Sequence, residues 1–177
     1  MSVRRSAAAI ATAFVLAVPA ATSFSSAEAG LACTITGTNG DDVLNGTSGP
    51  DVICAKGGFD EIDGKGGDDT IKAGPGQDIV TAGQGADTVT GGPGPDIVYG
   101  GQGRDSLYGG RGRDDLRGGR NKDTLVGGAG SDSCLHAMDG RPGDDVLGGP
   151  GTDTADMDAG DNLTSVEVVT TQVCFGG

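Results

Sequence analysis

Residues 91–99 read GGPGPDIVY, and the nine residues that follow them, 100–108, read GGQGRDSLY without a spacer. Both copies fit the pattern G-G-x-G-x-D-x-U-x, in which U is an apolar residue. Eleven consecutive copies of this pattern fill residues 37–135. A fixed short period predicts a solenoid, in which each repeat packs only on its neighbours.

The sixth position of the repeat is aspartate in every one of the eleven copies. These residues are Asp42, Asp51, Asp60, Asp69, Asp78, Asp87, Asp96, Asp105, Asp114, Asp123 and Asp132. Two degenerate copies that follow, GRPGDDVL from Gly140 and GGPGTDTAD from Gly148, extend the series to Asp145 and Asp153. Chance does not produce so strict a period, and a disordered acidic tail does not need one.

The eighth position of the repeat is apolar, which predicts one core residue in a strand of three residues. These positions hold Leu44, Ile53, Ile62, Ile71, Val80, Val89, Val98, Leu107, Leu116, Leu125 and Cys134. The glycine positions predict turns that need positive φ or close backbone approach. Asn121 replaces glycine at the fourth position, and asparagine is the other residue that tolerates positive φ well.

The composition excludes several classes of protein. The chain has 177 residues, 36 of them glycine and only 3% aromatic, which is too little large apolar surface for a globular enzyme core. The formal net charge of −13 excludes nucleic acid as a partner and favours cations. No HExxH or GxSxG motif is present, and the only histidine, His136, is interpreted as a loop residue. We therefore expect no catalytic activity.

The chain divides into four parts by composition and by the phase of the repeat. Residues 1–29 are interpreted as a secretory signal peptide, because Arg4 and Arg5 precede an apolar stretch too short to span a membrane, and Ala27-Glu28-Ala29 suits a signal peptidase. We therefore expect a secreted, extracellular protein without a transmembrane segment. Residues 30–36 form an N-terminal lead-in, in which Ile35 is in phase with the repeats.

Residues 37–156 make up the repeat array, with an insertion at residues 136–139. Residues 157–177 follow as a C-terminal cap, because residues 163–175 alternate in polarity and are rich in valine and threonine, as expected of a strand. Four cysteines, Cys33, Cys54, Cys134 and Cys174, remain after the signal peptide. An even number in a secreted chain predicts two disulfides, with three possible pairings, and the absence of CxxC argues against zinc.

The repeat pattern resembles that of the RTX family of calcium-binding nonapeptide repeats. The resemblance covers residues 37 to about 156. It implies an all-β fold, a right-handed parallel β-roll with two repeats per turn, here closed by a short C-terminal capping strand. It also implies that each repeat stacks on the next but one, so that Asp42 lies over Asp60. Ca²⁺ would lie between two such turns, held by backbone carbonyls and by one carboxylate oxygen from each turn.

The resemblance implies a ligand set for each ion: carbonyls at positions one and three of one turn, carbonyls at positions two and four of the other, and both aspartates. Such an oxygen set suits calcium. The side-chain candidates are the eleven aspartates from Asp42 to Asp132 together with Asp145 and Asp153. The carbonyl candidates include Gly74, Gly76, Gly83, Gly85, Gly92, Gly94, Gly101 and Gly103.

We expect about nine ions and a fold that depends on them, because one core residue per nine cannot offset the entropy of ordering a glycine-rich chain. Further acids near the turns would balance the charge of the ions or simply form a solvated face. These are Asp41, Glu61, Asp63, Asp68, Asp115 and Asp144.

A turn made of two repeats also predicts the disulfides. Cys33 and Cys54 are separated by one such turn plus three residues, so they should lie in adjacent turns on one side of the roll. Cys134, in the last repeat of the array, would then pair with Cys174 of the cap. Each bridge would secure one end of the solenoid.

The leading functional hypothesis is an extracellular calcium-binding protein, expected to be a monomer. The alternative is a module that binds an envelope glycan or ice, with purely structural calcium. An ice-binding face needs an array of threonines, but Thr88 and Thr90 are followed in the next repeat by Ile97 and Tyr99. A basic cluster could contact an anionic envelope polymer, although charge balance explains it better. It comprises Arg104, Arg111, Arg113, Arg117, Arg120 and Lys122.

Overall fold

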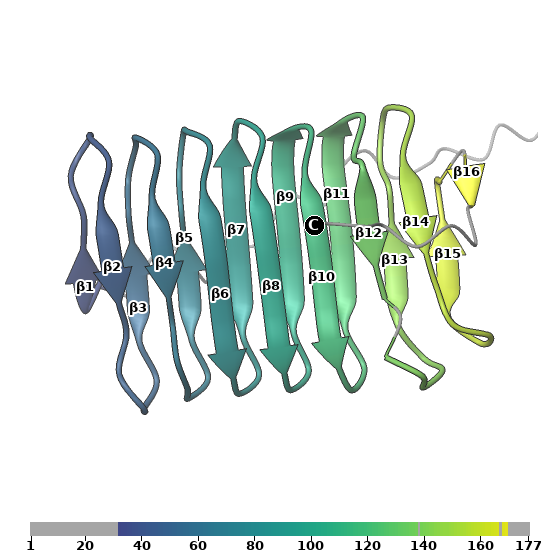
Figure 1. Cartoon of the computed structure of the whole chain (residues 1–177), viewed down its shortest axis with the longest axis horizontal. Helices are drawn as coiled ribbons and strands as arrows, with labels where there is room; N and C mark the ends of the chain where they lie inside the picture. The colour runs from purple at the N-terminus through teal and green to yellow at the C-terminus, as the bar shows by residue number, and fades with distance from the viewer. Residues whose placement is uncertain (1–31, 138, 167, 170–177) are drawn as a thin grey trace, which may run out of the picture. The chain divides into compact units, whose positions relative to one another are not determined.

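The computed structural model describes residues 32–137, 139–166 and 168–169. These residues belong to one compact unit and fold into short strands that alternate between two parallel sheets (Figure 1). The predicted signal peptide lies outside the described residues. Within the described ranges, no helix is long and apolar enough to cross a bilayer.

Each sheet contains eight strands, and successive strands of the chain belong to different sheets. The first sheet consists of β1 (Ile35–Thr36), β3 (Val52–Cys54), β5 (Thr70–Lys72), β7 (Thr88–Pro93), β9 (Ser106–Gly112), β11 (Thr124–Gly130), β13 (Asp145–Leu147) and β15 (Asn162–Thr164). The second consists of β2 (Val43–Asn45), β4 (Glu61–Asp63), β6 (Ile79–Gln84), β8 (Ile97–Gln102), β10 (Asp115–Arg120), β12 (Cys134–His136), β14 (Thr154–Asp156) and β16 (Val168–Val169).

The register confirms that two repeats make one turn. Val80 pairs with Val98, and Val98 with Leu116, so each residue lies opposite the equivalent residue two repeats along the chain. The eighth-position side chains from both sheets meet between the sheets, where Ile53, Leu107 and their equivalents are fully buried. The core is wider than the one residue per strand that the sequence predicts, because β6 buries Ala82 as well as Val80, and Ala55 and Ala73 at the same position of their repeats are also buried in the core.

The central strands are longer than the three residues predicted. The strands from β6 to β11 have six or seven residues, because the ladder continues through the glycines after the apolar position, as in the pairing of Gly83 with Gly101. Close approach is possible there only without a side chain. Gly92 has φ +126°, and a Cβ on it would collide with the carbonyl of Gly74. Asn121 has φ 80°, as predicted for a residue that replaces glycine.

The N-terminal lead-in forms the predicted incomplete turn. β1 pairs with β3, with Ile35 opposite Ile53. The predicted disulfide between Cys33 and Cys54 is present, with a Cα–Cα distance of 5.9 Å. The other predicted pair, Cys134–Cys174, includes a residue outside the described ranges and stays a prediction.

The prediction that Cys134 holds the core position is wrong. Leu135, not Cys134, pairs with Leu116, because one extra residue separates Asp132 from the core position. His136 is also not part of a loop, since it extends β12 opposite Arg117. The rest of the insertion lengthens the turn that follows. The separation between successive stacked aspartates therefore rises from 18 residues, between Asp105 and Asp123, to 21 residues, between Asp123 and Asp144.

The C-terminal cap continues the roll instead of forming one strand. β15 pairs with β13, and Leu163 lies opposite Val146 as a further core residue. The chain then crosses to the other sheet, where β16 pairs with β14. Two short strands in different sheets therefore occupy the start of the segment predicted as a single strand, and residues 170–177 lie outside the described ranges.

A leucine pair tests the importance of the narrow core. Leu107 is fully buried, whereas Leu147 is 38% exposed. Leu107→Ala should lower the free energy of unfolding by about 2–5 kcal/mol, because it leaves a cavity that the stacked turns cannot close. Leu147→Ala should cost less than about 1 kcal/mol. Urea denaturation in excess calcium measures both values, and equal losses would contradict this account of the core.

Candidate metal sites along the turns

The turns carry two rows of stacked aspartates, one on each side of the roll. Row 1 comprises Asp42, Asp60, Asp78, Asp96, Asp114, Asp132 and Asp153. Row 2 comprises Asp51, Asp69, Asp87, Asp105, Asp123, Asp144 and Asp161. In both rows, Oδ1 of each aspartate after the first accepts a hydrogen bond of 2.7–3.1 Å from the backbone N–H of the preceding aspartate in its row.

The second carboxylate oxygen, Oδ2, has no donor in most members of the rows. The aspartates with a buried Oδ2 that receives no hydrogen bond are Asp60, Asp69, Asp78, Asp87, Asp96, Asp105, Asp114, Asp123, Asp132, Asp144 and Asp153. Their side chains are almost fully buried, with Asp60, Asp78, Asp114 and Asp153 at 0% exposure. A buried charged oxygen without a partner is costly, so these atoms require a cation or a proton.

The space between two successive turns of a row, here called a gap, is lined by further oxygens. A Cβ built on Gly91 would lie 2.5 Å from Oδ2 of Asp96 and 2.8 Å from the carbonyl oxygen of Gly109, one turn later. The carboxylate of one turn and the first carbonyl of the next therefore converge on the same space. The absence of a side chain on Gly91 leaves this space open.

The carbonyls of two adjacent turns face each other across the gap. Carbonyl oxygens at positions one and three point to the preceding turn, since Gly91 accepts from the N–H of Gly74 at 2.8 Å and Pro93 from that of Gly76 at 2.9 Å. The carbonyls of Gly74 and Gly76 point the other way, against Gly92 and Gly94 of the following turn. Each gap thus contains position-one and position-three oxygens from one turn and position-two and position-four oxygens from the other.

The oxygens that line the gaps suit a hard cation. Each carbonyl oxygen that accepts an inter-turn hydrogen bond has a second lone pair. No group of three or more His, Cys, Asp or Glu side chains converges among the described residues. An all-oxygen set with few carboxylates fits Ca²⁺ and does not fit zinc.

Burial changes the acidity of the rows. Desolvation is the main cause that raises the pKa of Asp96 and Asp123 to about 7, against the hydrogen bond that each accepts from the preceding aspartate. It raises the pKa to about 6 for Asp69, Asp105, Asp114 and Asp144. Neighbouring aspartates of the same row add repulsion. The metal-free rows therefore bind protons far more readily than ordinary carboxylates do.

The sequence pattern predicted Asp145 as a member of the series, whereas the structure places Asp144 there. Asp144 is 1% exposed, and its Oδ1 accepts the N–H of Asp123. Asp145 is the first residue of β13 and forms a salt bridge of 2.9 Å with Lys122. The spacing of stacked aspartates rises by three residues here, from 18 to 21, instead of by the four residues of the predicted insertion. The aspartate of the row therefore lies one position earlier than predicted, and the pair of adjacent aspartates conceals the difference.

Asp161 is a member of row 2 that sequence reasoning missed. Its Oδ1 accepts the N–H of Asp144 at 3.1 Å and the N–H of Gly143 at 2.8 Å. The signal that could have revealed it is the apolar Leu163 two residues later, which reproduces the D-x-U part of the repeat. The glycines of a complete repeat do not precede it.

The other acids near the turns have several separate roles. Asp41 and Asp68 lie at the fifth position, and each accepts the N–H of the residue one turn later, Phe59 and Ala86 respectively. Asp115 forms a salt bridge with Arg117. Glu61 and Asp63 are exposed on β4. These acids lie outside the buried rows.

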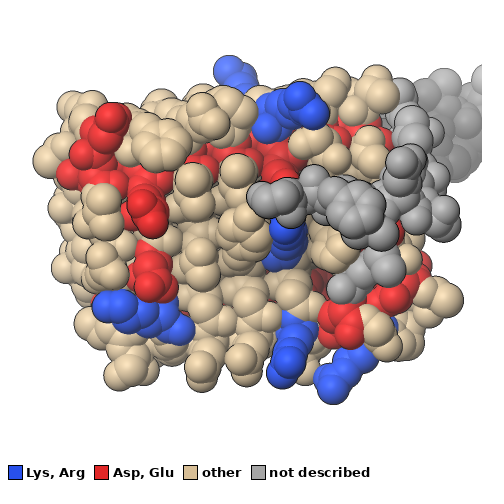
Figure 2. Space-filling view, in the orientation of Figure 1, with Lys and Arg blue, Asp and Glu red and all other residues tan. Residues whose placement is uncertain are grey.

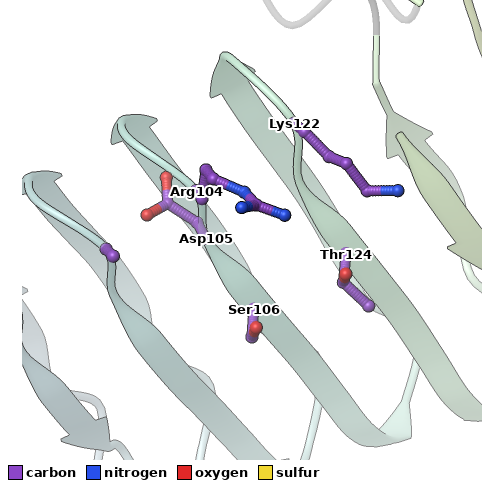
Figure 3. A pocket seen from close by; sticks show the side chains of 6 residues that line it. Arg104, Asp105, Ser106, Lys122 and Thr124 are labelled. Atoms are coloured by element: carbon purple, nitrogen blue, oxygen red, sulfur yellow. The ribbon is translucent and has the colours of Figure 1, made fainter. Parts of the chain in front are cut away.

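The basic residues do not form one cluster. They come from consecutive repeats, which alternate between the two rows, and Figure 2 shows Lys and Arg side chains near both edges of the face in view. Arg117 is engaged with Asp115 and lies 5.2 Å from the ring centroid of Tyr99. Arg104 and Lys122 line an open hollow beside Ser106 and Thr124 (Figure 3).

The threonine array was also misjudged, because the true neighbours are two repeats apart. Thr70, Thr88, Ser106 and Thr124 lie in register across the first sheet. The parallel column holds Lys72, Thr90, Tyr108 and Val126. A hydroxyl column one residue wide is therefore present, whereas the second column needed for a flat array changes in chemistry from turn to turn.

One family model matches this chain, that of the RTX calcium-binding nonapeptide repeat (4 copies), over residues 36–55, 55–89, 81–116, 90–125 and 99–134. Neither the comparison with curated proteins nor that with solved structures found a match. The matched stretches together span more than half of the chain and contain the first eleven aspartates of the two rows. The repeats of this family bind Ca²⁺. The chain therefore belongs to the RTX calcium-binding nonapeptide repeat family.

Proposed function

We propose that this chain is a secreted calcium-binding protein that holds Ca²⁺ in the gaps between successive turns of the roll. The observation that carries the proposal is the row of buried carboxylate oxygens without hydrogen-bond donors. Each of them faces carbonyl oxygens of the next turn, and a divalent cation there would neutralise charges that the fold otherwise leaves uncompensated.

The gap between Asp78 and Asp96 illustrates the proposed ligand set. Oδ2 of Asp78 would contribute from one turn, together with the carbonyls of Gly74 and Gly76. Asp96 would contribute from the other turn, together with the carbonyls of residues 91 and 93. The equivalent carbonyls of Gly83, Gly85, Gly92, Gly94, Gly101 and Gly103 would serve the neighbouring gaps. The glycines at positions two and four, such as Gly74 and Gly76, would keep their carbonyls aimed into the gap.

The proposal includes folding that depends on calcium and no catalytic activity. The core consists of one large aliphatic side chain per repeat and a few alanines, while the buried carboxylates of a row repel one another. An extracellular location is supported by the Cys33–Cys54 disulfide, since such bonds persist in oxidising compartments. About nine ions remains our expectation for the full chain.

Removal of calcium should unfold the roll. Far-UV circular dichroism of the protein should show disorder in chelator and β structure in millimolar calcium, because the ions bind only the folded turns. Magnesium should replace calcium poorly, since it requires a smaller octahedral site and retains its water. The same β content with and without calcium would contradict the proposal.

A matched pair of aspartates tests which carboxylates bind the ion. Asp87→Asn should reduce the number of bound ions or weaken calcium binding at least tenfold, because Asp87 lies inside row 2 between two gaps. Asp145→Asn should leave calcium binding within about twofold, because Asp145 pairs with Lys122 outside the row. Isothermal titration calorimetry measures both. An equal effect of the two substitutions would count against the rows as the binding sites.

Low pH should partly replace calcium in stabilising the folded roll. The raised pKa values mean that protonated carboxyls stabilise the metal-free roll fully below the unfolded-state pKa of about 3.9, and that this contribution disappears as pH rises through about 6 to 7. In calcium-free buffer, the β signal in circular dichroism should therefore increase as pH falls from 8 to 4.5. A weaker β signal at pH 4.5 than at pH 8 would show that protonation of these carboxylates does not stabilise the metal-free roll.

A further inference from the structure

The first turn of each row departs from the repeat at its second position. Thr38 and Thr47 stand there, where most later copies have glycine. The backbone N–H and the hydroxyl of Thr38 donate to Oδ2 of Asp42 at 2.6 and 3.0 Å. Thr47 donates to Oδ2 of Asp51 in the same way, at 2.7 and 2.9 Å.

These hydrogen bonds occupy the oxygen that is left without a donor in the following turns. In later turns the second residue has positive φ, as at Gly74 (φ +112°), and its N–H reaches the carbonyl of Gly91 in the next turn. In the first turns the N–H instead turns back to the aspartate of its own turn. The two threonine hydroxyls also bond to Gly40 and Gly49, which closes each turn on itself.

The second turn of each row carries a lysine at the same position. Nζ of Lys56 donates to the carbonyl of Gly37 at 2.7 Å, and Nζ of Lys65 to the carbonyl of Gly46 at 2.8 Å. Carbonyls at position one point to the preceding turn, and among the described residues only the incomplete lead-in turn precedes these two turns, without a residue at its second position. Each lysine ammonium group therefore donates to a carbonyl oxygen that in later turns accepts from a backbone N–H of the preceding turn.

In row 2, the pKa values of the first two aspartates agree with this arrangement of donors. The backbone hydrogen bond from Thr47 is the main cause that lowers the pKa of Asp51, and the Lys65 charge adds to it. The next member of the row, Asp69, has its pKa raised to about 6 by burial. Asp51 thus already has the donors and the positive charge that Asp69 lacks.

We propose that the first gap of each row, between Asp42 and Asp60 and between Asp51 and Asp69, binds no calcium, because the chain's own threonine donors occupy the carboxylate oxygen Oδ2 that would face the ion and the lysine of the second turn adds positive charge nearby. The calcium sites then begin at the second gap. This inference rests on the proposed function and makes the N-terminal end, fastened by the Cys33–Cys54 disulfide, a metal-independent platform on which the calcium-dependent turns stack.

A count of bound ions tests the inference, with the full secreted chain, calcium as the probe and equilibrium dialysis as the measurement. Asp51→Asn should bind as many ions as the unmodified protein, since its gap holds none. Asp69→Asn should bind one fewer, since its Oδ2 faces the gap toward Asp87. Loss of one ion from Asp51→Asn, with the β signal retained in calcium, would overturn the inference.

A gain-of-site experiment provides the opposite test. Thr47→Gly removes the hydroxyl donor to Oδ2 of Asp51 and permits the positive φ at which the backbone N–H turns to the next turn, as at Gly74, so it should add one calcium per chain. The matched control Thr47→Ser keeps both donors and should add none. An unchanged count for Thr47→Gly would overturn the inference. If the unmodified protein binds no calcium, the proposed function itself fails; if it binds calcium and only these variants disagree, the proposed function stands.

Discussion

The hydrogen bond from the N–H of one aspartate to Oδ1 of the aspartate one turn later is the interaction on which the roll depends. It recurs along both rows and fixes the stacking of the turns to a register of 18 residues. Because it uses one carboxylate oxygen, it leaves the other directed at the neighbouring carbonyls. One residue type thus sets the register and creates the demand for positive charge.

Because the carboxylates are buried, their negative charge needs a compensating group, and more than one kind of group can fill this role. In the middle of the rows the buried Oδ2 atoms receive no hydrogen bond, so a cation or a proton must compensate the carboxylates. At the N-terminal end the chain supplies its own compensation through threonine hydroxyls and lysine ammonium groups. The first turns therefore compensate their aspartates with donors of the chain itself, whereas the later turns leave the equivalent oxygen without a donor.

The period of the sequence predicted most of the fold, because a nine-residue repeat with one apolar position leaves few ways to form a core. It predicted the burial of Ile53 and Leu107. The resemblance to the RTX family supplied two repeats per turn, and with them the two rows up to Asp132 and the Cys33–Cys54 bridge. Prediction failed where the period breaks. A single extra residue moved the core position from Cys134 to Leu135, and the tandem acids allowed Asp145 to be chosen over Asp144.

A second kind of failure arose from reading neighbours along the chain instead of across the sheet. Thr88 was compared with the next repeat, although its true neighbours are Thr70 and Ser106. The role of Thr38 and Lys56 was not predicted for the same reason, because along the chain each looks like a simple replacement of the glycine at the second position. Only the inter-turn contacts show that each pair of substitutions recurs at the start of both rows.

The alternation of repeats between two sheets also limits how such a chain can change in length. Duplication or deletion of two repeats preserves every sheet column, because each later repeat keeps its sheet and its row. A change of a single repeat keeps the core pattern but transfers every later repeat to the opposite sheet. The hydroxyl column of the first sheet would be cut in two, and Arg117 would leave Tyr99. For this protein the pair of repeats is therefore the unit whose duplication or deletion preserves the residue columns on both sheets.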